Sequence, residues 1–204
     1  MLNSDGFDLW SKDYDKTVQL SEEENEYPFA GYKEVLNTIY KEIRSGNGKT
    51  VLDAGFGTGI LSQKLYDEGV EIYGIDFSSE MVKTAQKKMP NAKLFQCDFL
   101  KGLPGELSDK KFDFIISTYA VHHLTNEEKT AFIKELRGQL NTQGKILLGD
   151  VAFETQQDMD RCAEQAGYKW DDEEIYIVKE NLQKDFPDLE FKKISFCGAV
   201  VVIS

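Results

Sequence analysis

Hydrophobic and polar positions follow two rhythms along this chain. Apolar residues recur at helical spacing over residues 29–43, whereas short unbroken apolar runs appear after residue 48. Such runs, bounded by Gly, Pro and polar residues, predict strands buried on both faces. We expect strands at 49–54, 70–75, 93–96, 112–117 and 145–149. Because helical patterns separate these strands, the sequence predicts an α/β fold with a mostly parallel sheet covered on both faces.

Capping residues locate the helices between these strands. We expect helices over 60–67, 78–89 and 125–140. Ser78 is a suitable N-cap, and Pro90 stops the helix that Ser78 begins. Thr125 and Glu128 have the spacing of a capping box, in which each side chain bonds the backbone N–H of the other residue.

The last part of the chain departs from this alternation. Two helical patterns occur near 156–166 and 174–185, followed by strand patterns at 190–196 and 199–204. Only Cys197 and Gly198 separate the last two strands, and so short a connection permits a hairpin but no parallel crossover. The sheet is therefore expected to end with an antiparallel strand.

We expect one domain over residues 1–204, with four parts. Phe7, Trp10 and Tyr14 fall at helical spacing, so residues 1–46 are predicted to form a helical cap. The cofactor-binding core is expected at 47–150, an insertion on the acceptor side at 151–188, and the hairpin at 189–204.

Composition narrows the class of protein. The chain has 204 residues, 41% hydrophobic and 29% charged, as globular domains do, and no apolar run long enough to cross a bilayer. The beginning does not resemble a signal peptide, so a cytoplasmic location is expected. A net charge of −12 disfavours nucleic acid as a partner.

Three scattered cysteines indicate neither a disulfide framework nor a metal site, so no metal is expected. Monomer and homodimer stay open.

The most informative motif is VLDAGFGTG at residues 51–59, where the first strand meets the first helix. Gly55 and Gly57 allow a sharp bend and a close approach of a ligand to the backbone. The dinucleotide fingerprint G-x-G-x-x-G would need glycine at position 60, which is Ile60. Asp53 lies two residues before the first glycine, where its charge suits a ligand ammonium group better than a pyrophosphate.

Two further acidic residues follow strands. Asp76 ends the second predicted strand, close to the ~20-residue offset at which an acid binds ribose hydroxyls in nucleotide-binding folds. Asp98, in Cys97-Asp98-Phe99 after the third strand, is placed to accept the amine of adenine, while Phe99 or Phe77 packs on the ring. Each aspartate alone could be only a helix cap or a turn residue.

Together these motifs resemble those of class I S-adenosylmethionine-dependent methyltransferases. The sequence FDFIIS at 112–117, followed by His122-His123-Leu124, is similar to the small-molecule branch, and the likeness is greatest to the YrrT-like group of bacterial methyltransferases. The resemblance implies a Rossmann-like seven-stranded sheet in the order 3-2-1-4-5-7-6 with strand 7 antiparallel. It implies S-adenosylmethionine as cofactor, S-adenosylhomocysteine as product and a small molecule as methyl acceptor.

The resemblance also implies roles at the amino-acid end of the cofactor. Asp53 would orient the amino group of the methionine moiety. Ala54, Gly55 and Gly57 would line its carboxylate and sulfonium side. Ser117, at the end of the fourth strand, would contact the methionyl part through its backbone carbonyl.

At the adenosine end, the resemblance implies that Asp76 takes the ribose. Around the adenine it places Phe77, Met81, Cys97, Asp98 and Phe99. Tyr14, from the N-terminal cap, is expected at the wall of the same site.

His122 and His123 are the only histidines and the candidate catalytic bases, should the acceptor lose a proton. The alternative is structural: one caps the next helix and the other packs. Asp150 is a rival base, and Tyr119 is a candidate donor at the pocket wall. Aromatic residues such as Tyr27 could build a lid or simply belong to the core.

Two other functions stay open from the sequence. One is a non-catalytic regulatory module that binds S-adenosylmethionine or S-adenosylhomocysteine on the same fold. The other is a nicotinamide-dependent oxidoreductase, which the glycine spacing and the terminal hairpin disfavour.

Overall fold

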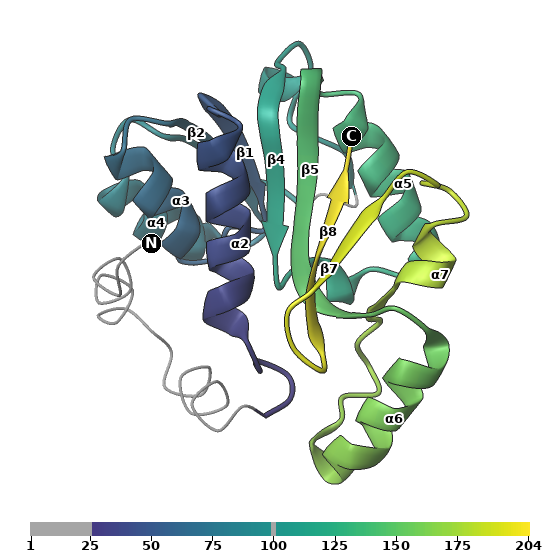
Figure 1. The fold of residues 1–204 in the computed structure, drawn as a ribbon. Helices are drawn as coiled ribbons and strands as arrows, with labels where there is room; N and C mark the ends of the chain where they lie inside the picture. Colours follow the sequence, from purple (N-terminus) through teal and green to yellow (C-terminus); the bar gives the residue numbers. More distant parts are fainter. Residues whose placement is uncertain (1–25, 99–100) are drawn as a thin grey trace.

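A computed structural model describes residues 26–98 and 101–204 (Figure 1). Tyr14 and Phe99, two of the predicted site residues, lie outside these ranges. The main sheet has the order β3 (Lys93–Gln96), β2 (Glu71–Asp76), β1 (Thr50–Ala54), β4 (Phe112–Thr118), β5 (Leu140–Phe153), β8 (Gly198–Ile203) and β7 (Glu190–Lys193). The first five strands are parallel, and β8 is antiparallel to both β5 and β7.

Helices cover both faces of this sheet. On one face α2 (Tyr32–Ser45), α3 (Ile60–Asp67) and α4 (Ser79–Lys88) pack on sheet residues such as Val51 and Ile116. On the other face α5 (Asn126–Arg137) and the short α7 (Lys179–Leu182) pack on the alternate residues, such as Leu52 and Ile115. Figure 1 shows α2 crossing in front of the central strands and α6 (Gln156–Ala166) standing off the main sheet. The two-sided burial explains the unbroken apolar runs.

The predicted strand order is confirmed, with one strand more than expected. A short β6 (Ile177–Val178) pairs in parallel with the end of β5, at Ala152 and Phe153. The sheet therefore has eight strands, and β8 occupies the place expected for strand seven.

The helix predicted at 174–185 is wrong. Ile177 and Val178 form β6 instead, and only Lys179–Leu182 is helical. Both residues are β-branched and buried, so they fit a strand paired with β5 better than a helix. β5 itself is longer than predicted, Leu140–Phe153, and this extra length provides the partner.

The terminal hairpin is confirmed with a longer connection than predicted. β7 ends at Lys193 and β8 begins at Gly198. Between them, the backbone N–H groups of Ile194 and Ser195 both donate to the carbonyl oxygen of Gly198, at 2.9 and 3.0 Å.

Both predicted caps are present. The Ser78 side chain accepts from the backbone N–H of Met81, and the two reciprocal bonds of the Thr125–Glu128 capping box are formed. Short 3-10 turns connect some of the larger elements, among them η5 (Val121–His123), between β4 and α5, and η6 (Gly167–Lys169), after α6. Within the described residues, none of the helices has the length and apolar character needed to span a membrane.

The order of the strands places a crevice at one edge of the sheet. The chain leaves β1 toward β2 and β3 on one side, and later returns to β4 and β5 on the other. In open α/β sheets, ligands bind outside the carboxyl ends of the strands at this switch point. Ala54, Asp76 and Thr118 end β1, β2 and β4 at that edge. The predicted site residues follow these strand ends.

Candidate functional site

The glycine loop after β1 adopts a backbone conformation that favours glycine at three positions. Gly55, Gly57 and Gly59 have φ angles of 77°, 54° and 73°, in the left-handed region that other residues rarely adopt. The Gly55 N–H donates to the carbonyl oxygen of Ile75 at 2.7 Å, which ties the loop to β2. A Cβ at Gly57 would meet no described atom within 4 Å. The loop therefore has an open side where a ligand can approach the backbone.

Asp53 lies beneath this loop and is only 2% exposed. Its Oδ2 accepts a 2.5 Å hydrogen bond from the Ser62 hydroxyl, while Oδ1 is buried with no hydrogen-bond partner among the described residues. Burial raises the pKa of Asp53 to about 7; the Ser62 hydrogen bond opposes this, and the nearby Asp76 charge adds to it. A cationic group beside Oδ1 would compensate this carboxylate.

Asp76 is nearly buried and holds the loop in place. Its Oδ2 accepts from the Gly57 N–H at 2.8 Å, and its Oδ1 from the Ser78 N–H at 2.9 Å. Each carboxylate oxygen has a second lone pair, so Asp76 can still accept from ligand hydroxyls. The residue therefore has a structural task that the sequence did not reveal, which is compatible with the predicted ribose contact.

Ser117 joins the two strands that border the crevice. Its buried hydroxyl donates to the carbonyl oxygen of Ala54 at 2.7 Å. Shortly after it, Tyr119 has a φ of 50°, which is unusual for a residue with a side chain. Its N–H donates to the Gly149 carbonyl oxygen, so the end of β4 is held to β5. Backbone strain of this kind is concentrated at functional sites.

A hollow of about 700 Å³ opens at the same edge of the sheet. This volume is ordinary for a small-molecule site. It is lined by Phe77, Gln96, Cys97, Asp98, Lys101, His123 and Leu124. The structure thus brings Phe77, Cys97 and Asp98 together with His123, from separate motifs. Phe77 is 72% exposed and Met81 is 37% exposed, which is unusual for large apolar side chains and leaves them free to contact a ligand.

Cys97 and Asp98 differ in what they offer this hollow. The Cys97 thiol donates to the Gly102 carbonyl oxygen at 3.3 Å, and burial raises its pKa, which disfavours a reactive thiolate. Asp98 is more exposed and forms a 3.1 Å ion pair with Lys101. The Asp98 carboxylate is thus partly exposed to solvent, where a ligand amine can reach it.

His122 is held by Asp150. Its Nδ1 lies 2.7 Å from Oδ1 of Asp150, which is fully buried and also accepts from the N–H groups of Val121 and Val151. Burial lowers the pKa of His122, but the Asp150 charge and hydrogen bond, together with Glu174, more than offset this, so the pKa is raised overall. Asp150 is fully buried and bonds the imidazole, an arrangement that favours positioning of His122 over a role as base.

Two residues of this region were missed by sequence reasoning. Glu174 Oε2 lies 3.0 Å from His123 Nδ1 and 3.9 Å from His122 Nε2. Lys129 is 2% exposed, and its Nζ donates to the carbonyl oxygens of Leu124 and Ile175. Burial lowers the pKa of Lys129 to about 8, although Asp150 and Glu174 act in the opposite direction.

A signal for Lys129 does exist in the sequence. Phe132, Ile133 and Leu136 form the buried stripe of α5, and Lys129 lies on that stripe at i−3, i−4 and i−7. A lysine at a core position of an amphipathic helix calls for buried acceptors. Glu174 has no such signal, because it comes from a distant segment.

The aromatic residues that could build either a lid or core divide into two groups. Tyr27 is buried, and its hydroxyl bonds that of Tyr176, so Tyr27 belongs to the core. Phe29, Tyr32 and Tyr119 contact one another, with ring centroids 4.8 to 5.9 Å apart. This second group lies where the chain leaves β4 and enters α2, and it stays a candidate wall of the crevice.

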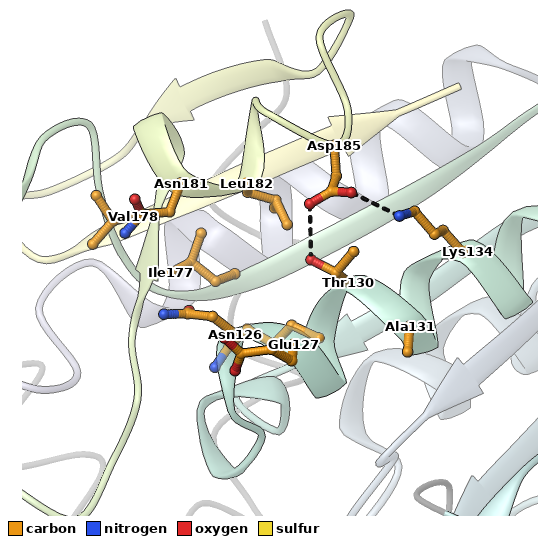
Figure 2. Close-up of a pocket in the computed structure, with 11 residues that line it drawn as sticks. Asn126, Glu127, Thr130, Ala131, Lys134, Ile177, Val178, Asn181, Leu182 and Asp185 are labelled. Atoms are coloured by element: carbon orange, nitrogen blue, oxygen red, sulfur yellow. Dashed lines mark hydrogen bonds and ion pairs between the residues drawn. The ribbon is translucent and has the colours of Figure 1, made fainter.

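A second hollow, of about 390 Å³, lies between α5 and α7 (Figure 2). Figure 2 shows Asp185 facing Lys134 and Thr130 across it, with an ion pair of 2.6 Å to Lys134. None of the residues predicted from the sequence to bind a ligand lines it. Two of its charged groups, Lys134 and Asp185, pair across it.

Comparison with known proteins gives a consistent result. Residues 51–144 match a family model described as a methyltransferase domain. An uncharacterized methyltransferase of Geobacillus sp. (strain WCH70) is 40% identical over 161 residues, covering 78% of this chain and 72% of that protein. The uncharacterized methyltransferase YrrT of Bacillus subtilis (strain 168) is 36% identical over 170 residues, covering 80% of this chain and 76% of YrrT.

The fold also matches a solved structure. The magnesium protoporphyrin IX methyltransferase of Synechocystis PCC 6803, crystallised with S-adenosylhomocysteine, has a TM-score of 0.70 at 22% identity, covering 98% of this chain and 94% of that one. At that identity the likeness concerns the fold alone.

The raised pKa of Asp53 makes a prediction about stability in the absence of ligand. Because the folded pKa is about 7 and the unfolded pKa is about 3.9, the folded state binds more protons between these values. Stability is therefore lost as pH rises from about 4 to about 7. In urea unfolding, the free energy of unfolding of the wild type should fall with rising pH by up to about 1.4 kcal/mol per pH unit more than that of Asp53→Asn. If the difference in free energy of unfolding between the two proteins did not vary with pH, the raised pKa of Asp53 would be contradicted.

Proposed function

This chain belongs to the YrrT-like methyltransferases, and we propose that it transfers the methyl group of S-adenosylmethionine to a small-molecule acceptor bound at the carboxyl edge of the sheet. The single observation that carries this proposal is the buried, unpartnered Oδ1 of Asp53 under an open glycine loop. A methionine moiety brings an ammonium group to that place, whereas a pyrophosphate would bring further negative charge.

S-adenosylmethionine, the methyl donor of this family, supplies a sulfonium with an activated methyl group. The backbone at Ala54, Gly55 and Gly57 offers the open surface for its amino-acid tail. The Ser117–Ala54 hydrogen bond fixes the distance between β1 and β4, and so sets the width of the crevice at that point. We infer that Ser117 contacts the methionyl part through its backbone.

The proposed position of the adenosine part rests on residues at or just after the ends of β2 and β3, and on Met81 in α4. Asp76 keeps lone pairs for the ribose hydroxyls after bonding Gly57 and Ser78. Phe77 and Met81 provide exposed apolar surface for the faces of the adenine. Asp98, at the rim of the hollow, accepts from the adenine amine. We propose Cys97, Phe99 and Tyr14 as further neighbours.

The acceptor side of the site is formed by η5, which carries His122 and His123. Nδ1 of His122 is hydrogen-bonded to Asp150, so Nε2 is the ring nitrogen that can contact the acceptor. His123 lines the hollow directly. Holding the acceptor atom and the methyl carbon at roughly 3–3.5 Å and in line can supply much of the rate enhancement by itself. The strong negative charge of the chain disfavours a polyanionic acceptor.

The alternative of a non-catalytic regulatory module has no support. The relatives that cover most of this chain are named methyltransferases, and His123 lines the hollow. An oxidoreductase is disfavoured by the uncompensated Asp53.

Replacing Asp76 tests the cofactor site. Asp76→Ala should weaken binding of S-adenosylhomocysteine by about 1–3 kcal/mol, or roughly 5- to 150-fold, because a charged acceptor is lost and the loop loses its anchor. Calorimetric titration measures this. Asp67→Ala, an exposed aspartate at the end of α3, is the matched control and should bind as the wild type does. Equal affinity in Asp76→Ala and wild type would remove Asp76 from the site.

Catalysis is tested by transfer of an isotope-labelled methyl group. The wild type, supplied with labelled S-adenosylmethionine and fractions of a bacterial metabolite extract, should give a labelled small molecule and S-adenosylhomocysteine in equal amounts. Tight binding of S-adenosylhomocysteine without a labelled product from any fraction would contradict the proposed reaction and leave only cofactor binding.

A further inference from the structure

We propose that His122, His123 and Glu174 form a binding site for a divalent metal ion of the zinc type, at the edge of the hollow that His123 lines. The sequence does not indicate a metal, because the three residues are not clustered along the chain. In the structure, one ligand atom from each lies within 4.8 Å of the other two. The role of the ion in methyl transfer rests on the proposed function, but the binding itself does not.

The spacing of the three groups suits one ion. Two ligand atoms bound to a tetrahedral zinc at about 2.0–2.1 Å lie about 3.3 Å apart. Oε2 of Glu174 is 3.0 Å from Nδ1 of His123 and 3.9 Å from Nε2 of His122. The two imidazole rings lie together, with centroids 4.3 Å apart. The two histidine ligand atoms lie no more than 4.8 Å apart, so side-chain shifts of roughly 1 Å would bring all three atoms to ligating distance.

His122 already has the partner that metal-binding histidines need. Ligating histidines usually donate their other ring N–H to a carboxylate, which fixes the tautomer and raises the basicity of the ligand nitrogen. Here Nδ1 bonds the fully buried Asp150, so a proton at Nδ1 leaves the lone pair at Nε2, which lies 3.9 Å from Oε2 of Glu174. Asp150 in turn is fixed by the Val121 and Val151 N–H groups.

Glu174 is held in place, but one of its carboxylate oxygens lacks a hydrogen bond. The Ile175 N–H donates to the His122 carbonyl oxygen at 2.9 Å, and the buried Lys129 bonds the Ile175 carbonyl oxygen. The segment that carries Glu174 is therefore fixed against η5. Oε2 of Glu174 is nevertheless buried without a hydrogen bond from any described residue, although His123 Nδ1 is only 3.0 Å away.

This geometry favours an ion over a simple ion pair. A protonated imidazole that paired with Glu174 would aim its N–H at Oε2, and no bond of acceptable angle is formed. A metal between two ligand atoms lies off the line that joins them, so the lone pairs point beside that line. Leaving a buried carboxylate oxygen unpaired costs free energy, and an ion would remove that cost.

Three protein ligands leave one position open, as in catalytic zinc sites. His123 reaches this hollow from η5, the element of the proposed acceptor side, so the open position would serve an acceptor bound at η5. There the ion would lower the pKa of an acceptor thiol or hydroxyl group, whose proton leaves to water. The acceptor lone pair then forms the bond to the methyl carbon, and the bond between that carbon and the donor sulfur breaks with its electron pair on sulfur.

Metal binding is measured directly with Co²⁺, which takes zinc sites and has visible absorption bands. The chain, without a histidine tag and freed of metal by a chelator, should bind one Co²⁺ saturably, and Zn²⁺ should displace it. Glu174→Gln and His123→Gln should each weaken binding at least tenfold, and Asp150→Asn about 10- to 100-fold. Glu173→Gln, the exposed neighbouring glutamate, is the matched control and should bind normally.

The same samples are titrated with S-adenosylhomocysteine, which separates this proposal from the proposed function. No saturable Co²⁺ binding by wild type, with normal S-adenosylhomocysteine binding, would overturn the metal site alone. Equal Co²⁺ binding by wild type and both ligand variants would also overturn it, because the ion would then lie elsewhere on the acidic surface. His123 is 60% exposed, so its replacement tests the site without disturbing the core.

Discussion

The arrangement of this site depends on a buried carboxylate whose charge the protein does not compensate. Asp53 is enclosed at the end of β1, satisfied by Ser62 on one oxygen only. The glycine loop above it cannot supply a cation, and Asp76 adds a second negative charge nearby. Burial favours the protonated carboxyl, and a ligand that brought a positive group to the loop would stabilise the charged form. The proposed preference for a methionine-like tail over a phosphate rests on the same observation.

The two halves of the site are built differently. The proposed cofactor half comes from consecutive strand ends, β1, β2 and β3, where each motif and its turn lie within a few residues of each other. The proposed acceptor half combines η5 after β4, Asp150 in β5, Lys129 in α5 and the segment around Glu174. Buried ionic groups hold these elements together, because Lys129 and Asp150 each bond backbone groups of a neighbouring segment.

The sequence predicts the strands, caps and hairpin well, and the contacts that join distant segments poorly, for physical reasons. Strand alternation, the caps at Ser78 and Thr125 and the terminal hairpin depend on local patterns, and all were found. The short β6 was missed because its two residues also fit a helical pattern, and only pairing with the extended β5 decides between them. Glu174 was missed because its position results from tertiary contacts alone.

The central claim is that Asp53 receives the ammonium group of the cofactor. It is tested by calorimetric titration of S-adenosylhomocysteine at pH 6.5 in buffers of different ionisation enthalpy. Without ligand, a pKa of about 7 keeps Asp53 mostly protonated, and the arriving ammonium group lowers that pKa. Wild type should release about three quarters of a proton on binding, and Asp53→Asn should release almost none. Equal proton release by both proteins would contradict the account.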